Sequence, residues 1–272
     1  MSERRERGTG AGAAFEQAKA EGRAALVGYL PAGFPTVPEA IEACRVLADS
    51  GVDVIEIGLP YSDPVMDGAV IQQAAERALR AGFRVADVFR TVEAVAASGV
   101  PALVMTYWNP VERHGVTAFA RDLASAGGAG LITPDLIPDE ADEWLAASDE
   151  YGLDRVFLVA PSSTEQRIGS TVAACRGFVY ATSVMGVTGA RAQTSQAAPA
   201  LVSRVRQATS LPIGVGLGVS TGAQAAELAG YADGVIVGSA MVRCLLTADE
   251  PAAGRRALAA LTTDLAKGVR AG

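Results

Sequence analysis

The sequence alternates short apolar runs with longer segments of helical period, and this alternation occurs eight times. The runs cover residues 24–30, 53–59, 102–108, 130–135, 155–161, 177–184, 212–218 and 234–239. Most of them are apolar at nearly every position, which is typical of strands buried on both faces of a parallel sheet. Eight strand–helix units within about 250 residues predict an α/β protein with a single-domain (β/α)8 TIM barrel. Extra helices are expected because the second crossover holds two helical patterns, at 70–81 and 85–98.

A doubly wound open sheet is the alternative architecture. Such a sheet usually has fewer strands, and its dinucleotide-binding form carries G-x-G-x-x-G after the first strand. Here the glycine run GVGLGVSTG follows the seventh apolar run instead, at residues 214–222. We expect residues 1–12, which are charged and rich in Gly and Ala, to form a flexible tail, and residues 13–272 to form the barrel domain.

Composition excludes several classes of function. The formal net charge is −7 and the pI is about 4.9, whereas a nucleic-acid-binding protein needs a basic surface against phosphates. The apolar runs are shorter than the ~20 residues that span a bilayer, and the first residues lack the apolar core of a secretory signal. We therefore expect a cytoplasmic protein that binds neither nucleic acid nor membrane.

The cysteines and the histidine also limit the chemistry. Cys44, Cys175 and Cys244 are far apart in the sequence, and we expect them to be buried, reduced thiols. His114 is the only histidine, and the sequence around it predicts a polar turn. A histidine-based metal site and a Ser-His-Asp triad are therefore not expected.

Glu56 places a carboxyl group inside the second apolar run, on the same strand face as Val54 and Gly58. A buried carboxyl group must be paired, hydrogen-bonded or neutral, and burial raises its pKa toward that of an acid/base catalyst. The alternative is an ion pair with a cation inside the barrel. No run holds a lysine, and Arg155, at the start of the fifth run, is expected at the opposite end of the barrel. We therefore expect Glu56 to be catalytic.

Other candidates follow the strands, where barrel enzymes place their active sites. Asp67 is either an active-site acid or the N-cap of the next helix. Tyr180 either packs in the core or places a phenol near Glu56. The segments after the sixth, seventh and eighth runs are rich in Gly, Ser and Thr, which suits backbone N–H groups that bind a phosphate. The alternative for these glycines is that they only form tight turns.

Taken together, these motifs resemble the tryptophan synthase α-subunit family. The matching stretches, in chain order from about residue 13, are GYLPAGFPT, IEIGLPYSDPVMDGAVIQ, MTYWNPV, LITPDL, GVTGA, GVGLGVST and GVIVGSAMV. The resemblance implies a lyase that cleaves indole-3-glycerol phosphate to indole and glyceraldehyde 3-phosphate in L-tryptophan biosynthesis. It also implies a β-subunit partner, in an α2β2 assembly, that carries pyridoxal phosphate. No metal or organic cofactor is implied for this chain.

The resemblance also implies a role for each matching residue. Glu56 would shuttle a proton, Asp67 would hold the indole N–H, and Tyr180 would lie beside Glu56. The other implied positions are the phosphate donors Gly189, Gly218, Gly238 and Ser239, the indole-pocket residues Tyr29, Met105 and Ile132, the lid residue Thr188, and the docking residues Pro60, Asp63 and Asn109. Three alternatives stay open: a stand-alone lyase that releases free indole, a non-catalytic docking or regulatory subunit, and a different sugar-phosphate enzyme on the same fold.

Overall fold

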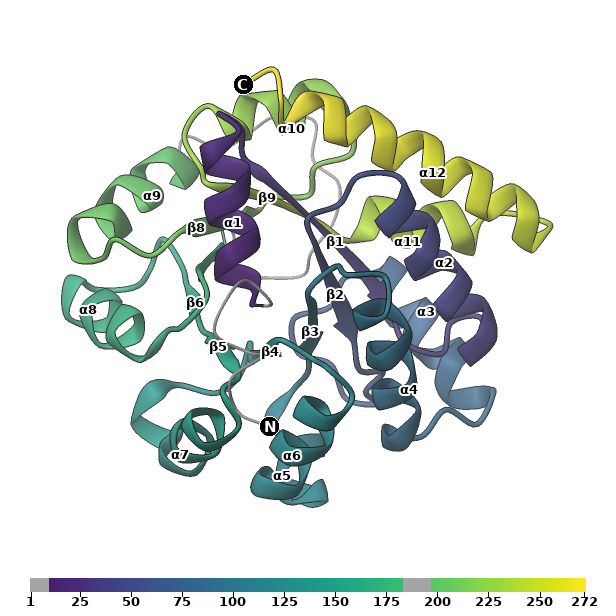
Figure 1. The fold of residues 1–272 in the computed structure, drawn as a ribbon, viewed down its shortest axis with the longest axis horizontal. Coiled ribbons are helices and arrows are strands. Elements are labelled where there is room, and N and C mark those ends of the chain that lie inside the picture. The colour runs from purple at the N-terminus through teal and green to yellow at the C-terminus, as the bar shows by residue number, and fades with distance from the viewer. Residues whose placement is uncertain (1–9, 183–196) are drawn as a thin grey trace.

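The strands form one parallel sheet that curls into a nearly closed barrel (Figure 1). The computed structural model describes residues 10–182 and 197–272. Its strands are β1 (Ala25–Pro31), β2 (Val54–Gly58), β3 (Ala102–Met105), β4 (Gly130–Ile132), β5 (Asp154–Val156), β6 (Leu158–Val159), β7 (Val179–Thr182), β8 (Ile213–Gly216) and β9 (Gly234–Val237). They lie in the order β5-β4-β3-β2-β1-β9-β8-β7-β6. The predicted TIM barrel is confirmed, and the doubly wound alternative is wrong.

The fifth predicted strand is split into two short strands. Strand β5 pairs with β4, and β6 pairs with β7, so the two ends of the sheet are consecutive in the chain. Only Phe157 separates them, and its carbonyl accepts a hydrogen bond of 3.2 Å from the backbone N of Tyr180. The single strand expected at 155–161 was therefore wrong in detail. Its first half pairs with one neighbour and its second half with the other, and this brings the barrel close to closure.

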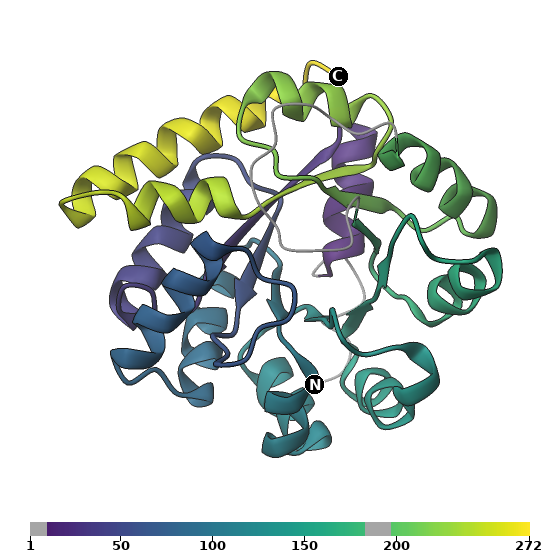
Figure 2. The same cartoon turned by 180° about the vertical axis from the view of Figure 1, so that it is seen from behind.

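Helices surround the barrel on the outside (Figures 1 and 2). They are α2 (Val37–Asp49), α3 (Ala69–Arg80), α4 (Val85–Ala96), α5 (Trp108–His114), α6 (Val116–Ser125), α7 (Asp142–Tyr151), α8 (Glu165–Ala174), α9 (Ala197–Ala208), α10 (Gly222–Ala229), α11 (Ser239–Leu246) and α12 (Pro251–Gly268), with a short 3-10 turn at Pro138–Glu140. The two helices expected in the second crossover are present as α3 and α4. Among the described helices, none is both long and apolar enough to cross a membrane.

The third strand is shorter than the run at 102–108 predicts, since β3 ends at Met105 and α5 begins at Trp108. The backbone N of Trp108 donates to both carboxylate oxygens of Asp135, at 2.9 and 3.1 Å. This carboxylate binds an amide that the first turn of a helix otherwise leaves unpaired. A contact with a residue 27 positions away therefore starts the helix inside an apolar run.

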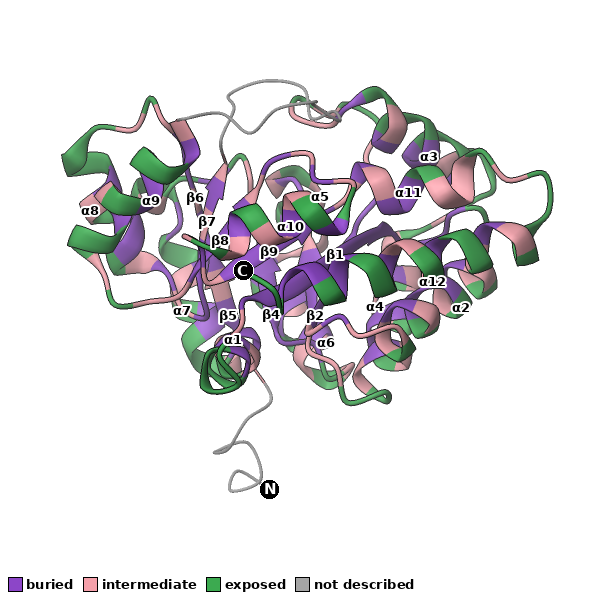
Figure 3. Ribbon diagram, turned by 90° about the horizontal axis from the view of Figure 1, so that it is seen from above, coloured by how far each residue is buried: buried purple, intermediate pink, exposed green. Residues whose placement is uncertain are grey.

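The strands divide the core into an inner and an outer layer, and Figure 3 shows the buried residues in the strands and on the inward faces of the helices. Val27, Val54, Leu103 and Ile236 belong to one cluster inside the barrel, and a second, larger cluster lies between the strands and the helices. Glu56 pairs in register with Leu103. Its side chain therefore points into the barrel, on the face predicted from the alternation of strand residues.

An N-terminal helix, α1 (Ala11–Ala20), crosses one end of the barrel (Figure 1). The ring of Phe15 stacks on Phe178 with centroids 4.7 Å apart, and the backbone N of Ala11 donates to Asp154 Oδ2 at 2.8 Å. Phe178 and Asp154 lie at the starts of β7 and β5, so α1 covers the end opposite the strand C-termini. Because of these contacts, regular structure begins at Ala11, two residues before the domain boundary expected from composition. That division into a tail and one domain stays a prediction.

Candidate active site

Glu56 is a buried carboxyl group that has no counter-charge among the described residues. Its side chain is 1% exposed, and Oε1 has no hydrogen-bond partner among the described residues. Burial alone raises its pKa to about 8. Arg155, the one strand cation weighed as its partner, forms ion-pair contacts with Asp149 and donates to the Ala174 carbonyl. The buried ion-pair interpretation of Glu56 is therefore wrong.

Two tyrosines lie beside Glu56 on the inner face of the barrel. Tyr29 pairs with Glu56 in register across β1 and β2, and it is 8% exposed. Burial raises the pKa of Tyr29 well above its usual value, and the charges of Asp67 and Glu56 raise it further. Burial, followed by the charge of Glu56, also raises the pKa of Tyr180. Both phenols are therefore protonated and within electrostatic range of Glu56, which favours the interpretation of Tyr180 as more than a packing residue.

Asp67 belongs to the barrel mouth and does not cap a helix. The N-cap of α3 is Gly68, which has no side-chain capping bond, so the N-cap interpretation of Asp67 is wrong. Its Oδ1 instead accepts a hydrogen bond of 3.2 Å from Tyr107 Oη. Burial raises the pKa of Asp67, and the bond from Tyr107 opposes that effect. A half-buried carboxylate thus shares the mouth of the barrel with the carboxyl group of Glu56.

Apolar side chains line the inner face next to these acids. Met105 pairs with Gly58 of β2 and with Ile132 of β4, so all three residues share the inner face. Ile132 is fully buried and Met105 is partly exposed. The two positions expected in an indole pocket therefore form a continuous wall beside the strand of Glu56, which suits a flat aromatic ligand.

Glycines after β8 and β9 form a second part of the site. Gly218 has a φ of 69°, a backbone conformation that glycine adopts without strain. Gly238 is the N-cap of α11, and Ser239 is its first residue. A Cβ added at Gly238 would lie 3.5 Å from Cδ1 of Tyr29, so the start of α11 is next to the Tyr29 ring. Free N–H groups at a helix N-terminus bind anions. Thr188 and Gly189 lie outside the described residues.

The expected docking residues differ in exposure. Asp63 and Asn109 are exposed, whereas Pro60 is buried in this chain and offers no free surface. Two large hydrophobic side chains within the described ranges are exposed, Val65 at 73% and Ile137 at 38%. They belong to the segments that follow β2 and β4, at the C-terminal ends of the strands.

Tyr107 is a site residue that the sequence analysis missed. It is 6% exposed, and its hydroxyl lies within hydrogen-bond distance of Asp67 and of the backbone N of Met66. The sequence did offer one indication of its role: Tyr107 lies near the C-terminal end of a predicted barrel strand and belongs to the matching stretch MTYWNPV. That place alone does not distinguish an active-site phenol from a packed one.

His114 is not in a polar turn, as the sequence suggested, but ends α5. Its ring packs against Phe89 and Phe119, with centroids 5.7 and 5.6 Å away, and its Nε2 lies 3.0 Å from Asp122 Oδ2. The described residues contain no cluster of acidic, His and Cys side chains that could hold a metal ion.

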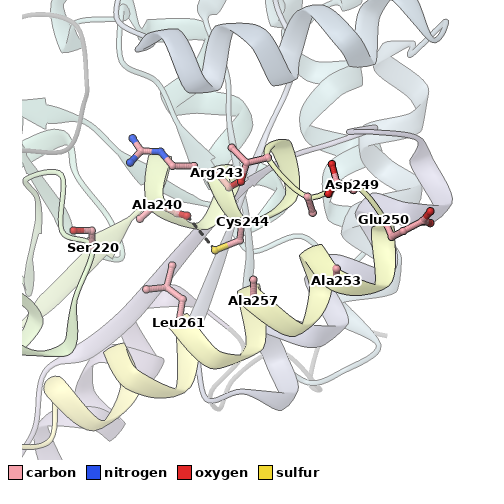
Figure 4. Close-up of a pocket in the computed structure, with 11 residues that line it drawn as sticks. Ser220, Ala240, Arg243, Cys244, Asp249, Glu250, Ala253, Ala257 and Leu261 are labelled. Carbon is pink, nitrogen blue, oxygen red and sulfur yellow. Dashed lines mark hydrogen bonds between the residues drawn. The ribbon is translucent and has the colours of Figure 1, made fainter.

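A separate groove of about 690 Å³ lies between α11 and α12 (Figure 4). It is lined by Ser220, Ala240, Arg243, Cys244, Thr247, Ala248, Asp249, Glu250, Ala253, Ala257 and Leu261. The Cys244 thiol lies 3.4 Å from the Ala240 carbonyl, as the dashed line marks. Cys244 is partly exposed here, whereas Cys44 and Cys175 are buried as expected; all three are free thiols. None of the predicted site residues lines this groove.

Comparisons with known proteins agree with this arrangement. The family model described as "Tryptophan synthase alpha chain" matches residues 15–270. The tryptophan synthase alpha chain of Salinispora arenicola is 68% identical over 259 residues, which cover 95% of this chain and 97% of the relative. That of Acidothermus cellulolyticus is 64% identical over 264 residues, with 96% and 97% covered.

Solved structures agree as well. A chain of Mycobacterium tuberculosis tryptophan synthase superposes with a TM-score of 0.92 and 59% identity, over 98% of this chain and 100% of that one. A tryptophan synthase subunit alpha from Legionella pneumophila superposes with a TM-score of 0.86 at 31% identity, over 94% and 96%. Since the family match, the relatives and the barrel all extend over nearly the whole chain, this protein belongs to the tryptophan synthase alpha chain family.

Proposed function

We propose that this chain is the α subunit of a tryptophan synthase and cleaves indole-3-glycerol phosphate to indole and glyceraldehyde 3-phosphate, with Glu56 as the acid/base. The observation that carries the proposal is the Glu56 carboxyl group itself. It is buried and meets no counter-charge in the described part of the chain, and its pKa of about 8 keeps it protonated at neutral pH. A protonated carboxyl group beside an apolar wall can donate a proton to an aromatic ring.

The chemistry requires two proton transfers. Glu56 first donates its proton to indole C3, and the ring becomes an iminium ion that accepts electrons at nitrogen. The bond between C3 and the glycerol carbon then breaks, and its electron pair returns to the ring. The glycerol hydroxyl becomes the aldehyde and gives its proton to the Glu56 carboxylate. The carboxyl group is thereby restored, and no other acid or base is consumed.

The second carboxylate stabilises the cation. Asp67 accepts the indole N–H and offsets the positive charge that develops on nitrogen. Support comes from its half-buried position at the barrel mouth and from the Tyr107 hydrogen bond, which favours its ionised form. Tyr29 and Tyr180 flank the reacting atoms, while Met105 and Ile132 contact the indole ring.

The phosphate of the substrate binds opposite the acids. Its proposed donors are the backbone N–H groups of Gly189, Gly218, Gly238 and Ser239, together with the Ser239 hydroxyl. The start of α11 at Ser239 and the left-handed turn at Gly218 support two of these positions. Thr188 is proposed as part of a lid that closes over the substrate.

The partner is proposed to be a tryptophan synthase β subunit that carries pyridoxal phosphate, in a cytoplasmic α2β2 assembly. Structural relatives of this chain are parts of tryptophan synthase structures. Asp63 and Asn109 are exposed, and Val65 and Ile137 place apolar surface on the same rim. Exposed apolar side chains at one rim are typical of a docking surface.

The test is turnover of indole-3-glycerol phosphate by the purified chain, with and without an added β subunit. We expect turnover by the parent chain and its loss in Glu56→Gln, while circular dichroism and glycerol phosphate binding stay unchanged. Wild-type turnover by Glu56→Gln would contradict the acid/base role. An inactive parent chain under both conditions would contradict the reaction, and full activity without the β subunit would indicate stand-alone release of indole.

A further inference from the structure

The hydroxyl of Tyr107 joins two segments that are distant in sequence. It accepts a hydrogen bond of 2.9 Å from the backbone N of Met66 and donates one of 3.2 Å to Asp67 Oδ1. These partners precede α3, 41 and 40 positions before Tyr107 in the chain. One phenol thus holds both the backbone and the side chain at the end of the segment that follows β2.

The part of that segment next to Asp67 is irregular and partly exposed. Residues 59–67 contain no helix or strand, and Val65 in its middle is 73% exposed. The Asp67 carbonyl accepts a bond of 2.8 Å from Gln72 Nε2, which holds the backbone but not the carboxylate. Among the described residues, Tyr107 is the single hydrogen-bond donor to the Asp67 carboxylate. The direction of that carboxylate therefore depends on the phenol.

Tyr107 is itself held firmly. Thr106 Oγ1 donates to the Tyr107 carbonyl at 2.8 Å, and the next backbone N, at Trp108, donates to Asp135. The ring of Tyr61 packs against the Tyr107 ring with centroids 5.3 Å apart. Contacts from the segments after β2 and β4 thus hold Tyr107 and its neighbour Trp108, and Tyr107 is only 6% exposed. A rigid support of this kind is what an active-site carboxylate requires.

The charges around Asp67 agree with this geometry. Burial raises the pKa of Tyr107 to about 12, so the phenol stays a donor at neutral pH. Within residues 10–182 and 197–272, Tyr29 on β1 is the other titratable group that interacts electrostatically with Asp67, and it also interacts with Glu56. Both phenols are neutral below their raised pKa values, so neither competes with Asp67 for a proton. The bond from Tyr107 is the interaction that lowers the pKa of Asp67 against the effect of burial.

We infer that Tyr107 is a positioning residue for the cleavage reaction, whose hydroxyl fixes the direction of the Asp67 carboxylate. The inference rests on the proposed function, since Asp67 matters only if a developing cation is bound there. Tyr107 exchanges no proton with the substrate. Its contribution is made through Asp67 and through the backbone at Met66.

The variant Tyr107→Phe keeps the ring and removes both hydrogen bonds. We expect kcat to fall by about 10- to 100-fold, with a smaller change in KM, and the acidic limb of the kcat profile to move to higher pH. In an Asp67→Asn background the same change should cause no further loss of rate. Tyr61→Phe is the matched control, because it removes the same atom from the neighbouring ring, whose hydroxyl has no hydrogen bond among the described residues.

The inference would be overturned by a Tyr107→Phe enzyme with parental kcat and pH profile, or by an equal loss of rate in Tyr107→Phe and Tyr61→Phe. A purely structural role would lower the melting temperature without moving the acidic limb. Failure of the proposed function is distinguishable, because the parent chain would then be inactive. The pKa of Asp67, followed by carboxyl-labelled NMR, should still rise in Tyr107→Phe, and an unchanged value would overturn the inference independently of activity.

Discussion

The phenol of Tyr29 fills the space that a side chain at Gly58 would need. A Cβ at position 58 would lie 2.1 Å from Tyr29 Oη and 2.5 Å from its Cζ. The same relationship recurs across the barrel, where a Cβ at Gly216 would lie 2.5 Å from Tyr180 Oη. Two glycines on the inner face thus make room for the two phenols that flank Glu56.

Gly58→Ala should therefore disrupt the site. The contacts at 2.1 and 2.5 Å are too short for any carbon, and they involve the tyrosine ring as well as its oxygen. We expect Tyr29 to be displaced, with a loss of about 1–3 kcal/mol in the free energy of unfolding and a drop of at least about 10-fold in kcat/KM. Urea denaturation and steady-state kinetics measure the two effects.

The matched control for this prediction is Gly169→Ala. Gly169 lies inside α8, and a Cβ there would meet nothing within 4 Å. Alanine should stabilise that helix by about 0.5–1 kcal/mol and leave the kinetics unchanged. Tyr29→Phe combined with Gly58→Ala should not restore activity, since the ring carbons still clash. A Gly58→Ala enzyme with parental stability and kcat/KM would refute the steric account.

Glu56→Gln should make the protein more stable at high pH. In the folded protein Glu56 holds its proton up to about pH 8, whereas in the unfolded chain it ionises near its usual value of 4.5. Between these values the folded state binds more protons, so its stability falls as the pH rises. Glutamine removes this loss. The variant should exceed the parent by at most about 5 kcal/mol at pH 8 and above, and match it below pH 4.5.

Urea denaturation of both proteins across this pH range measures the difference. Glu16→Gln is the control, because Glu16 is exposed on α1. It shows how much of the change comes from replacing an exposed glutamate by glutamine. A Glu56→Gln difference that stays constant between pH 4.5 and 8 would mean that Glu56 is ionised in the folded protein, contrary to the proposed acid role.

The sequence was sufficient to predict the barrel and the direction of Glu56. Strands buried on both faces produce apolar runs without alternation, and eight such runs leave few other architectures. Once the second run is a strand, the period of two places Glu56 on the face of Val54 and Gly58. The absence of lysine from the runs then predicted that Glu56 lacks a counter-charge inside the barrel.

Features that depend on distant contacts could not be predicted. The fifth strand splits at Phe157 because its two halves pair with different neighbours, which no local pattern encodes. Helix α1 is anchored by Asp154 and Phe178, more than 140 positions away. The role of Tyr107 requires its hydroxyl to reach Asp67 from another strand. Local pattern identifies which residues are candidates, but tertiary contacts decide which of them meet.

Phe15→Ala should lower the free energy of unfolding but leave the activity nearly unchanged. Phe15 is 1% exposed and stacks on Phe178 at the end of the barrel opposite the active site. Truncation of a buried aromatic side chain costs about 3–5 kcal/mol, and we expect this loss by urea denaturation. Well below the melting temperature, kcat should stay within about 2-fold of the parent, since Phe15 stacks on Phe178 at the end of the barrel opposite the strand C-termini.

The control on the same helix is Lys19→Ala, an exposed position that should change neither quantity measurably. If Phe15→Ala instead lowered kcat at a temperature where the protein is fully folded, the closed end of the barrel would be coupled to the site. The contact between Phe178 and Tyr180, with ring centroids 6.4 Å apart, would be the route to examine.

Val65→Ser should weaken binding of the proposed β subunit. Val65 is 73% exposed in this chain, and complete burial of a valine contributes about 1.5 kcal/mol or more. Loss of that contribution corresponds to an increase of about 10-fold in Kd, which calorimetry with the β subunit measures.

Ile137→Ser, in the segment after β4, should also increase the Kd for the β subunit. Ala13→Ser, an exposed position on α1 at the closed end, is the control and should leave Kd unchanged. If Val65→Ser, Ile137→Ser and the control all had the same Kd, the partner would bind elsewhere on the chain. Removal of apolar contacts from an interface lowers affinity, so an unchanged Kd would mean that Val65 and Ile137 are not in the interface.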